Sequence, residues 1–177
     1  MAFFYACFSL LLACFSHFAS PFGGAFLLVF TMFPYGKTSQ ARLSTCHADI
    51  QTIWNELSKY INASVFCGHR GREDQNDAFE KGSSELTWPN SKHNVYPSMA
   101  IDSGPYFVAL GNTDWKDEVA FGVFAGHVML VARQLYKQKK ITHLVRWGGD
   151  WDMDGRSRDE RFRDLPHFEL YVPEPLT

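Results

Sequence analysis

The sequence predicts one α+β domain that follows an apolar leader. Helical patterns come first in the charged part of the chain, and short strand patterns in mixed order come later. This order favours an α+β fold over a doubly wound parallel sheet. The chain has 177 residues, which is enough for one domain with its own core. We expect a small antiparallel sheet with flanking helices.

Residues 1–34 form the apolar leader. They contain no Lys, Arg, Asp or Glu and include nine of the sixteen Phe. Residues 1–19 approach the length of a bilayer crossing, but they lack the positive charge that opens a secretory signal. By the positive-inside rule, Lys37 and Arg42 after it would hold the domain in the cytoplasm. Three interpretations stay open: a membrane anchor, an atypical export signal, or untranslated upstream sequence before a start at Met32.

Residues 35–177 have the composition of an ordinary domain. The formal net charge of -2 gives no electrostatic basis for nucleic acid binding. Cys46 and Cys67 are expected to be two small buried thiols, with a disulfide between them as the alternative. We expect the domain to be a monomer.

Helices are expected at the start of the domain. A short helix is predicted over residues 39–46, with Ser39 as its cap. A longer helix begins at residues 47–49. Apolar residues follow on one face at helical spacing: Ile50, Ile53, Trp54, Leu57 and Ile61.

A buried strand is predicted over residues 64–68, followed by a loop at 69–71. A polar helix is then expected over residues 72–81, closed by Gly82. Residues 83–90 are expected to form a loop.

The second half alternates strands with one long helix. A strand over residues 99–101 carries Asp102 at its end. Residues 114–140 contain the long helix, in which Gly122 and Gly126 suggest close packing against a neighbour. Its core face is expected to hold Phe121, Phe124, Val128, Val131 and Leu135. The remaining elements are a strand over residues 142–147, a polar loop over 148–164 and a last strand over 167–172.

Two imidazoles and one carboxylate are candidate metal ligands. A short strand after a loop can return Asp102 beside His93, and the C-terminal strand can bring His167 alongside. A catalytic zinc ion uses three protein ligands and leaves its fourth position for water. Because the chain has seven His, this spacing alone is also compatible with histidines that bind no metal.

Several motifs in a fixed order support the metal hypothesis. Three of them contain the candidate ligands: Ser91-x-His93, Ala100-x-Asp102, and Asp164-x-x-His167 followed by Glu169. The other two are Gly68-His69-Arg70, which precedes a helix with Gln75, and the stretch from Arg146 to Asp152. Over residues 35–171 they resemble the M15 zinc peptidases. That family includes D-Ala-D-Ala carboxypeptidases, vancomycin-resistance dipeptidases and phage L-alanyl-D-glutamate endopeptidases. Relative to the common pattern, the interval from His93 to Asp102 is two residues longer, a form similar to a phage endolysin branch.

The resemblance implies a hedgehog-like or D-Ala-D-Ala-peptidase-like fold with one zinc ion on His93, Asp102 and His167. It implies that Asp164 is the catalytic base. Glu169 is the rival base, or else a partner that orients a histidine ligand.

The resemblance also assigns supporting residues. Arg70 would stabilise the developing oxyanion or hold a substrate carboxylate. Ser91 and Gln75 would bind substrate, and His69 and Asn94 would orient ligands.

Residues 150–155 open like a calcium loop, with Asp150, Asp152 and Asp154 in the pattern D-x-D-x-D-G. Arg161 stands at the twelfth position, where a Glu would be expected, and Glu160 is one residue short. A degenerate Ca²⁺ site is therefore one hypothesis. The other is a polar loop whose Asp residues pair with nearby arginines: Arg156, Arg158, Arg161 and Arg163.

The resemblance implies a zinc peptidase that cleaves the stem peptide of bacterial peptidoglycan, with L-Ala–D-Glu as the favoured bond. It would act on the cell wall at the periplasmic side, in phage lysis, and the leader over residues 1–33 would add a membrane contact. A D-alanyl-D-alanine carboxypeptidase is the alternative within this class. A non-catalytic, zinc-containing wall-binding domain is the alternative from another class, and the complete set of ligands, base and arginine argues against it.

Overall fold

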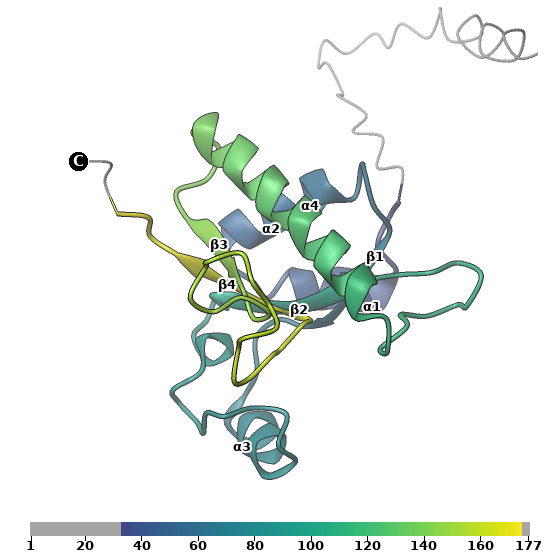
Figure 1. Cartoon of the computed structure of the whole chain (residues 1–177). Helices are drawn as coiled ribbons and strands as arrows, with labels where there is room; N and C mark the ends of the chain where they lie inside the picture. The colour runs from purple at the N-terminus through teal and green to yellow at the C-terminus, as the bar shows by residue number, and fades with distance from the viewer. Residues whose placement is uncertain (1–32, 175–177) are drawn as a thin grey trace, which may run out of the picture.

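A four-stranded antiparallel sheet with the order β1-β2-β4-β3 forms the centre of the domain (Figure 1). The computed structural model describes residues 33–174, so the expectations for the leader lie outside the described residues. The predicted α+β class is confirmed. The strands are Ala63–Cys67 (β1), Ala100–Pro105 (β2), Leu144–Trp147 (β3) and His167–Tyr171 (β4).

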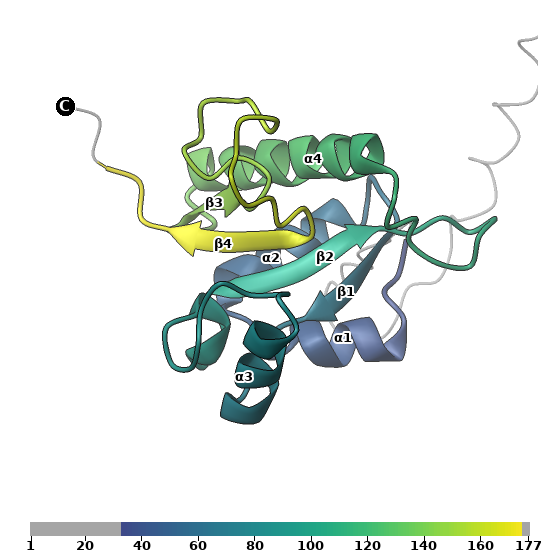
Figure 2. The same ribbon diagram turned by 60° about the horizontal axis from the view of Figure 1, so that its bottom comes forward.

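Helices surround this sheet unevenly. α4 packs against α2 and against strands β2 and β3, while α1 lies beside β1. α3 projects from the domain on the side away from α4 (Figures 1 and 2). The bounds are Lys37–Leu43 (α1), Ala48–Leu57 (α2), Arg72–Glu80 (α3), Glu118–Lys137 (α4) and Lys92–Asn94 for the short 3-10 helix η1.

The core lies between the sheet and the helices α2 and α4. The predicted apolar face of α2 is buried, and Trp54 is completely inaccessible. The ring of Phe168 packs edge-on against Trp54 and Phe124, with centroid distances of 5.6 and 5.7 Å. Trp54 Nε1 also donates to Ser103 Oγ at 2.9 Å. Burying each large apolar side chain contributes roughly 1.5–3 kcal/mol, so this contact holds β2 and β4 firmly against the helices.

α4 is the one helix within residues 33–174 that is long and apolar enough to span a membrane. Its predicted core face is buried in the domain, so packing accounts for its hydrophobicity. The expectation of close packing at Gly122 and Gly126 is wrong. A Cβ atom added at either position would meet nothing within 4 Å, because both glycines lie on the open side of the helix.

Three other expectations need correction. α1 begins at Lys37 after Gly36, so Ser39 lies inside the helix, where its Oγ accepts from Val65 N at 3.1 Å. β2 continues to Pro105, so Asp102 lies within the strand and not at its end. Finally, the cysteines of the domain are free thiols, which excludes the disulfide alternative in this structure.

Candidate active site

Strand register brings two of the candidate ligands together. β2 and β4 are antiparallel, and Asp102 lies directly opposite His167. η1 supplies His93 beside them. Asp102 Oδ1 lies 3.1 Å from both His93 Nε2 and His167 Nδ1, and these two nitrogens lie 3.2 Å apart. Three ligand atoms from three elements therefore form one small triangle.

This triangle has the dimensions of a zinc site. Tetrahedral zinc with bonds of ~2.0–2.1 Å places its ligand atoms about 3.3–3.4 Å apart. His93 and His167 also line a cleft of about 620 Å³, so a fourth position would face the cleft. The residues present thus fit a catalytic zinc ion.

Each imidazole faces an oxygen with its other nitrogen, as is usual for metal-ligating histidines. His93 Nδ1 lies 2.7 Å from the carbonyl oxygen of Gly68. A side chain at Gly68 would meet Arg42 O at 2.3 Å, so only glycine fits at this close approach to α1. His167 Nε2 lies 3.5 Å from Glu169 Oε2 and has no hydrogen bond within residues 33–174.

The electrostatics of the triangle favour positive charge. Burial alone would lower the pKa of His93, but the charge of Asp102 outweighs burial and raises it to about 10. Burial likewise opposes ionisation of Asp102, yet the neighbouring histidines hold its pKa far below the usual range. The site is therefore built to attract a cation.

Arg70 reaches the same carboxylate from β1's side of the sheet. Its Nη2 donates to Asp102 Oδ2 at 2.8 Å, and its Nη1 donates to Gln75 Oε1 at 3.4 Å. The side chain is only 15 % exposed and lines the cleft. Arg70 therefore braces Asp102 while presenting a guanidinium to the cleft.

Gln75 does not have the place that was expected for a substrate-binding residue. It is completely buried and is absent from the cleft lining. Its Nε2 donates to Leu86 O at 2.6 Å and to Ser84 Oγ at 3.0 Å. Gln75 thus ties Arg70 to the loop after α3 and supports the cleft from behind.

Of the other motif residues in this region, Ser91 lines the cleft, whereas Asn94 and His69 make structural contacts outside it. Ser91 lines the cleft and also caps η1, since its Oγ accepts from His93 N. Asn94 Nδ2 donates to the carbonyl oxygen of Arg70 at 3.0 Å, which joins η1 to the Arg70 loop. The ring of His69 packs against Tyr96, with centroids 5.4 Å apart.

Asp164 enters the cleft from the loop that precedes β4. Its N–H donates to Gly148 O at 2.8 Å, and its carbonyl accepts from His167 N at 3.0 Å. A side chain at Gly148 would meet Asp164 O at 2.4 Å, so this contact requires glycine. Burial, and secondarily the charge of Asp102, raises the pKa of Asp164 to about 6.

Glu169 has a different environment. Arg146 donates to Glu169 Oε1 through Nε at 3.1 Å and also through Nη2, and Lys92 Nζ lies 3.5 Å from the same oxygen. Burial raises its pKa, but the neighbouring imidazole of His167 and the hydrogen bonds from Arg146 outweigh burial and lower it to about 2. Glu169 is therefore a poor proton acceptor and a good anchor for His167.

The sequence analysis assigned neither Cys67 nor Trp151 to the site. Cys67 lies opposite Asp102 in the register of β1 and β2, and with His93 and Asp102 it forms a group of ligand atoms within 4.8 Å. It does not line the cleft, unlike His167. The Trp151 ring lies 5.4 Å from the His167 ring and 5.3 Å from Arg146 Cζ. Strand alternation could have indicated Cys67, and the motif from Arg146 to Asp152 contains Trp151 but does not reveal its contact with His167.

The acidic loop gathers its carboxylates as a cation site would. Asp150, Asp152 and Asp154 offer oxygens within 4.8 Å of one another. Asp150 Oδ2 accepts from Gly155 N at 3.0 Å, whereas its Oδ1 is buried with no partner in the described part of the chain. Glu160 Oε1 closes the loop by accepting from two backbone N–H groups.

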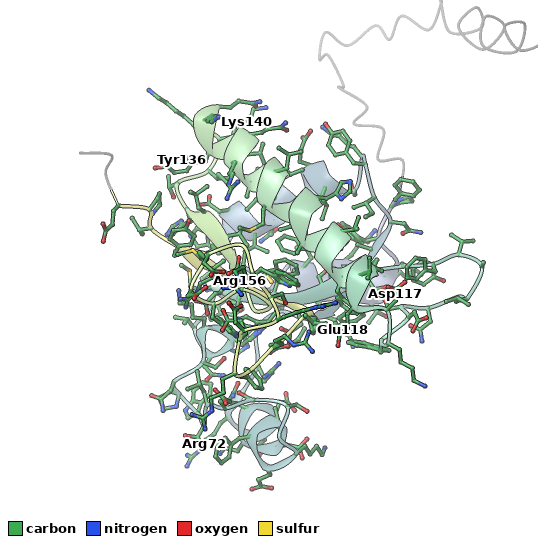
Figure 3. All side chains as sticks on the ribbon, viewed as in Figure 1. Arg72, Asp117, Glu118, Tyr136, Lys140 and Arg156 are labelled. Atoms are coloured by element: carbon green, nitrogen blue, oxygen red, sulfur yellow. The ribbon has the colours of Figure 1, made fainter. Side chains whose placement is uncertain are left out.

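The arginines of this loop do not pair with those three Asp residues. Arg156 pairs with Asp159 at 3.1 Å. Arg163 pairs with Glu118 at 2.8 Å. Glu118 lies at the N-terminal end of α4 (Figure 3). The salt-bridge interpretation of the loop is therefore wrong for the pairs that it named.

A third candidate metal-binding group contains His47, Asp49 and His143. It lies outside the cleft, and hydrogen bonds already occupy one of its oxygens. Asp49 Oδ2 accepts from His143 Nδ1 at 2.8 Å and from the backbone of Thr142 at 2.9 Å. This group joins the start of α2 to the segment before β3.

An α+β sheet that places imidazoles, ionised carboxylates and an arginine around one cleft has the form of a metallopeptidase active site. A model of the phage L-alanyl-D-glutamate peptidase family matches residues 31–171, and the chain belongs to this family. It is accordingly a peptidoglycan-hydrolysing L-alanyl-D-glutamate endopeptidase, as the motifs predicted.

Comparison with solved structures supports the fold. The L-Ala D-Glu endopeptidase ChiX of Serratia marcescens is similar with a TM-score of 0.58 and 24 % sequence identity. The match covers 80 % of this chain and 89 % of that chain. No curated protein sequence matches the chain.

Proposed function

We propose that this endopeptidase is zinc-dependent and binds one zinc ion through His93, Asp102 and His167. The observation that carries the proposal is the triangle of their ligand atoms, with sides of 3.1, 3.1 and 3.2 Å, beside the cleft. When bound, zinc acts as a Lewis acid that lowers the pKa of a water molecule to about 7 and polarises a carbonyl.

Asp164 is the proposed general base and acid. It takes the proton of the attacking water and later delivers a proton to the amine of the departing D-glutamate. Its raised pKa of about 6 supports this role, because a carboxylate with that pKa is ionised at neutral pH yet accepts protons readily.

Arg70 and Ser91 would handle the scissile peptide. Arg70 uses some donors on Asp102 and Gln75, but its guanidinium has five N–H groups. Those that remain can donate to the oxyanion that develops on the carbonyl of L-alanine. Ser91 lines the cleft beside His93, where it can bind the substrate backbone.

The acidic loop is the proposed site of a Ca²⁺ ion. Asp150, Asp152 and Asp154 supply hard oxygen ligands, and the unpartnered Oδ1 of Asp150 supports a cation there. Calcium would hold the loop that carries Trp151 against His167.

The proposal also covers the role of residues 1–34 and the place where the enzyme acts. We infer that residues 1–34 are dispensable for the chemistry and that any membrane contact involves them. The domain would act as a monomer on the periplasmic side of the cell wall. A chain shortened to begin at Met32 tests the first point, because it should be soluble, monodisperse and active.

The test of the proposed function combines metal analysis with digestion. The zinc-loaded protein should contain one zinc ion per chain, and His93→Ala and His167→Ala should lose it. Digested sacculi, analysed by mass spectrometry after amine labelling, should show new N-terminal D-glutamate. Full zinc content in both variants would contradict the ligand assignment, and release of single D-alanine would instead indicate a carboxypeptidase.

A further inference from the structure

Arg161 lines the active-site cleft without an ion-pair partner. Within residues 33–174, its exposed side chain makes no salt bridge, whereas Arg156 and Arg163 on the same loop each pair with a carboxylate. Arg158 also lacks an ion pair, but it does not line the cleft. Among the arginines of this loop, Arg161 is thus the one that lines the cleft and has no ion pair within the described residues.

Trp151 donates hydrogen bonds to both chain neighbours of Arg161, to the side chain of Glu160 and to the backbone of Phe162. The Trp151 N–H donates to Glu160 Oε1, and its indole Nε1 donates to Phe162 O at 2.9 Å. The indole ring itself packs against His167. The position of Arg161 is therefore built into the same unit that covers the proposed metal site.

The other cations of the cleft are already engaged. Arg70 binds Asp102, and Arg146 binds Glu169. Lys92 Nζ donates to Leu170 O at 2.6 Å. The cleft also contains Glu85 and Glu160, so an anionic substrate group needs a further positive charge there.

The chemistry of the substrate places such an anionic group near Asp164. The nitrogen of the scissile bond belongs to D-glutamate, and it must lie beside Asp164 to receive a proton. In the stem peptide the chain continues through the γ-carboxyl group, so the α-carboxylate is free and its carbon is two bonds from that nitrogen. Arg161 and Asp164 line the same cleft and lie on the same loop, so a substrate group beside Asp164 would share that cleft with the Arg161 side chain.

We propose that Arg161 binds the free α-carboxylate of D-glutamate and makes the enzyme select stem peptides in which this group is not amidated. The proposal rests on the proposed function of Asp164. A planar guanidinium can bind a carboxylate with two parallel hydrogen bonds, whereas it gains much less from a neutral carboxamide.

Two synthetic substrates test this selectivity. They are N-acetyl-L-Ala-γ-D-Glu-L-Lys and the same peptide with an α-carboxamide on the D-glutamate. Wild type should cleave the carboxylate form faster. Arg161→Gln should lose about 10–100-fold in kcat/KM on that form, the equivalent of one hydrogen-bonded charged group. On the carboxamide form, kcat/KM of this variant should differ from wild type by less than about twofold, so the variant should lose most of the preference for the carboxylate form.

Arg163→Gln is the matched control, because Arg163 lies on the same loop but pairs with Glu118. It should keep the rates and the preference of wild type, and Arg161→Lys should recover part of both. Equal losses on the two substrates, or no loss, in a zinc-loaded Arg161→Gln variant would overturn the proposal. Failure of wild type to cleave either substrate would instead overturn the proposed function, and this inference with it.

Discussion

Glu169 Oε2 lies 3.5 Å from Nε2 of His167, while Nδ1 of the same ring lies 3.1 Å from Asp102 Oδ1. The imidazole is thus held between two carboxylates, with one nitrogen toward the proposed metal site and the other toward Glu169. Arg146 fixes Glu169 in turn. This arrangement supports the proposal that Glu169 orients His167 and that Asp164 transfers the proton.

Removal of the Asp164 carboxylate should therefore affect kcat, whereas removal of the Glu169 carboxylate should affect zinc affinity. Asp164→Ala should keep its zinc and its fold but lose about 10²–10⁴-fold in kcat, because general-base help is worth that much. Glu169→Ala should bind zinc about 10–100-fold more weakly, and saturating zinc should restore part of its activity. Zinc affinity by competition with a chelator and kcat at saturating zinc separate these effects. An inert Glu169→Ala beside an active Asp164→Ala would reverse the roles.

The pKa of Asp164 predicts an acid limb in the pH profile. Burial raises this pKa to about 6, and a base works only when ionised, so activity should fall as pH drops through it. A nearby zinc cation favours the ionised form and can only move the limb lower. We expect a midpoint in kcat/KM at or below about pH 6, measured with zinc content checked at each pH. A midpoint above about pH 7 would argue against Asp164 as the base.

Local periodicity predicted the fold well where one face of an element is buried. The spacing of Ile50, Ile53 and Leu57 gave α2 and its core face, because a helix repeats its contacts every 3.6 residues. The same spacing places Gly122 and Gly126 opposite the core face of α4, but it could not say whether another element packs on that side. Without a side chain, a glycine is compatible with a close contact and with an open face, and the structure has the open face.

The candidate site could be predicted only where a motif determines chemistry. The motifs selected His93, Asp102 and His167, but the pairing of Asp102 with His167 depends on strand register, which one sequence does not reveal. A motif also cannot tell a residue that faces the cleft from one that supports it. Gln75 was expected at the substrate, yet it is buried and bonded to Leu86 O and Ser84 Oγ.

The acidic loop should respond to calcium. Adding millimolar Ca²⁺ to enzyme stripped with a chelator and reloaded with zinc should raise its melting temperature, since any ligand of the folded state stabilises it. Asp150→Asn should abolish this response because Asp150 Oδ1 is the buried, unpartnered oxygen. Asp159→Asn, on the same loop but paired with Arg156, is the matched control and should respond like wild type. No response of wild type would leave the loop without a calcium role.

Asp49 should matter for stability and not for catalysis. Its Oδ2 accepts hydrogen bonds from His143 and Thr142, and the side chain lies outside the cleft. Burial opposes its ionisation, but these hydrogen bonds outweigh burial and lower its pKa. Asp49→Asn should therefore lower the free energy of unfolding by about 2 kcal/mol at neutral pH, with kcat/KM unchanged below the melting transition.

The sign of the pH dependence follows from that lowered pKa. Stability contributed by ionised Asp49 is fully present above the unfolded pKa of about 3.9 and is lost as pH falls through the lower folded value. The difference between wild type and Asp49→Asn should thus be constant near neutrality and shrink only in strong acid. Asp77→Asn is the control, because Asp77 forms an exposed pair with Lys81 that is worth at most about 0.5 kcal/mol. Denaturant unfolding at several pH values gives the free energy of unfolding of each variant. Equal losses for the two substitutions at neutral pH would contradict the role of Asp49.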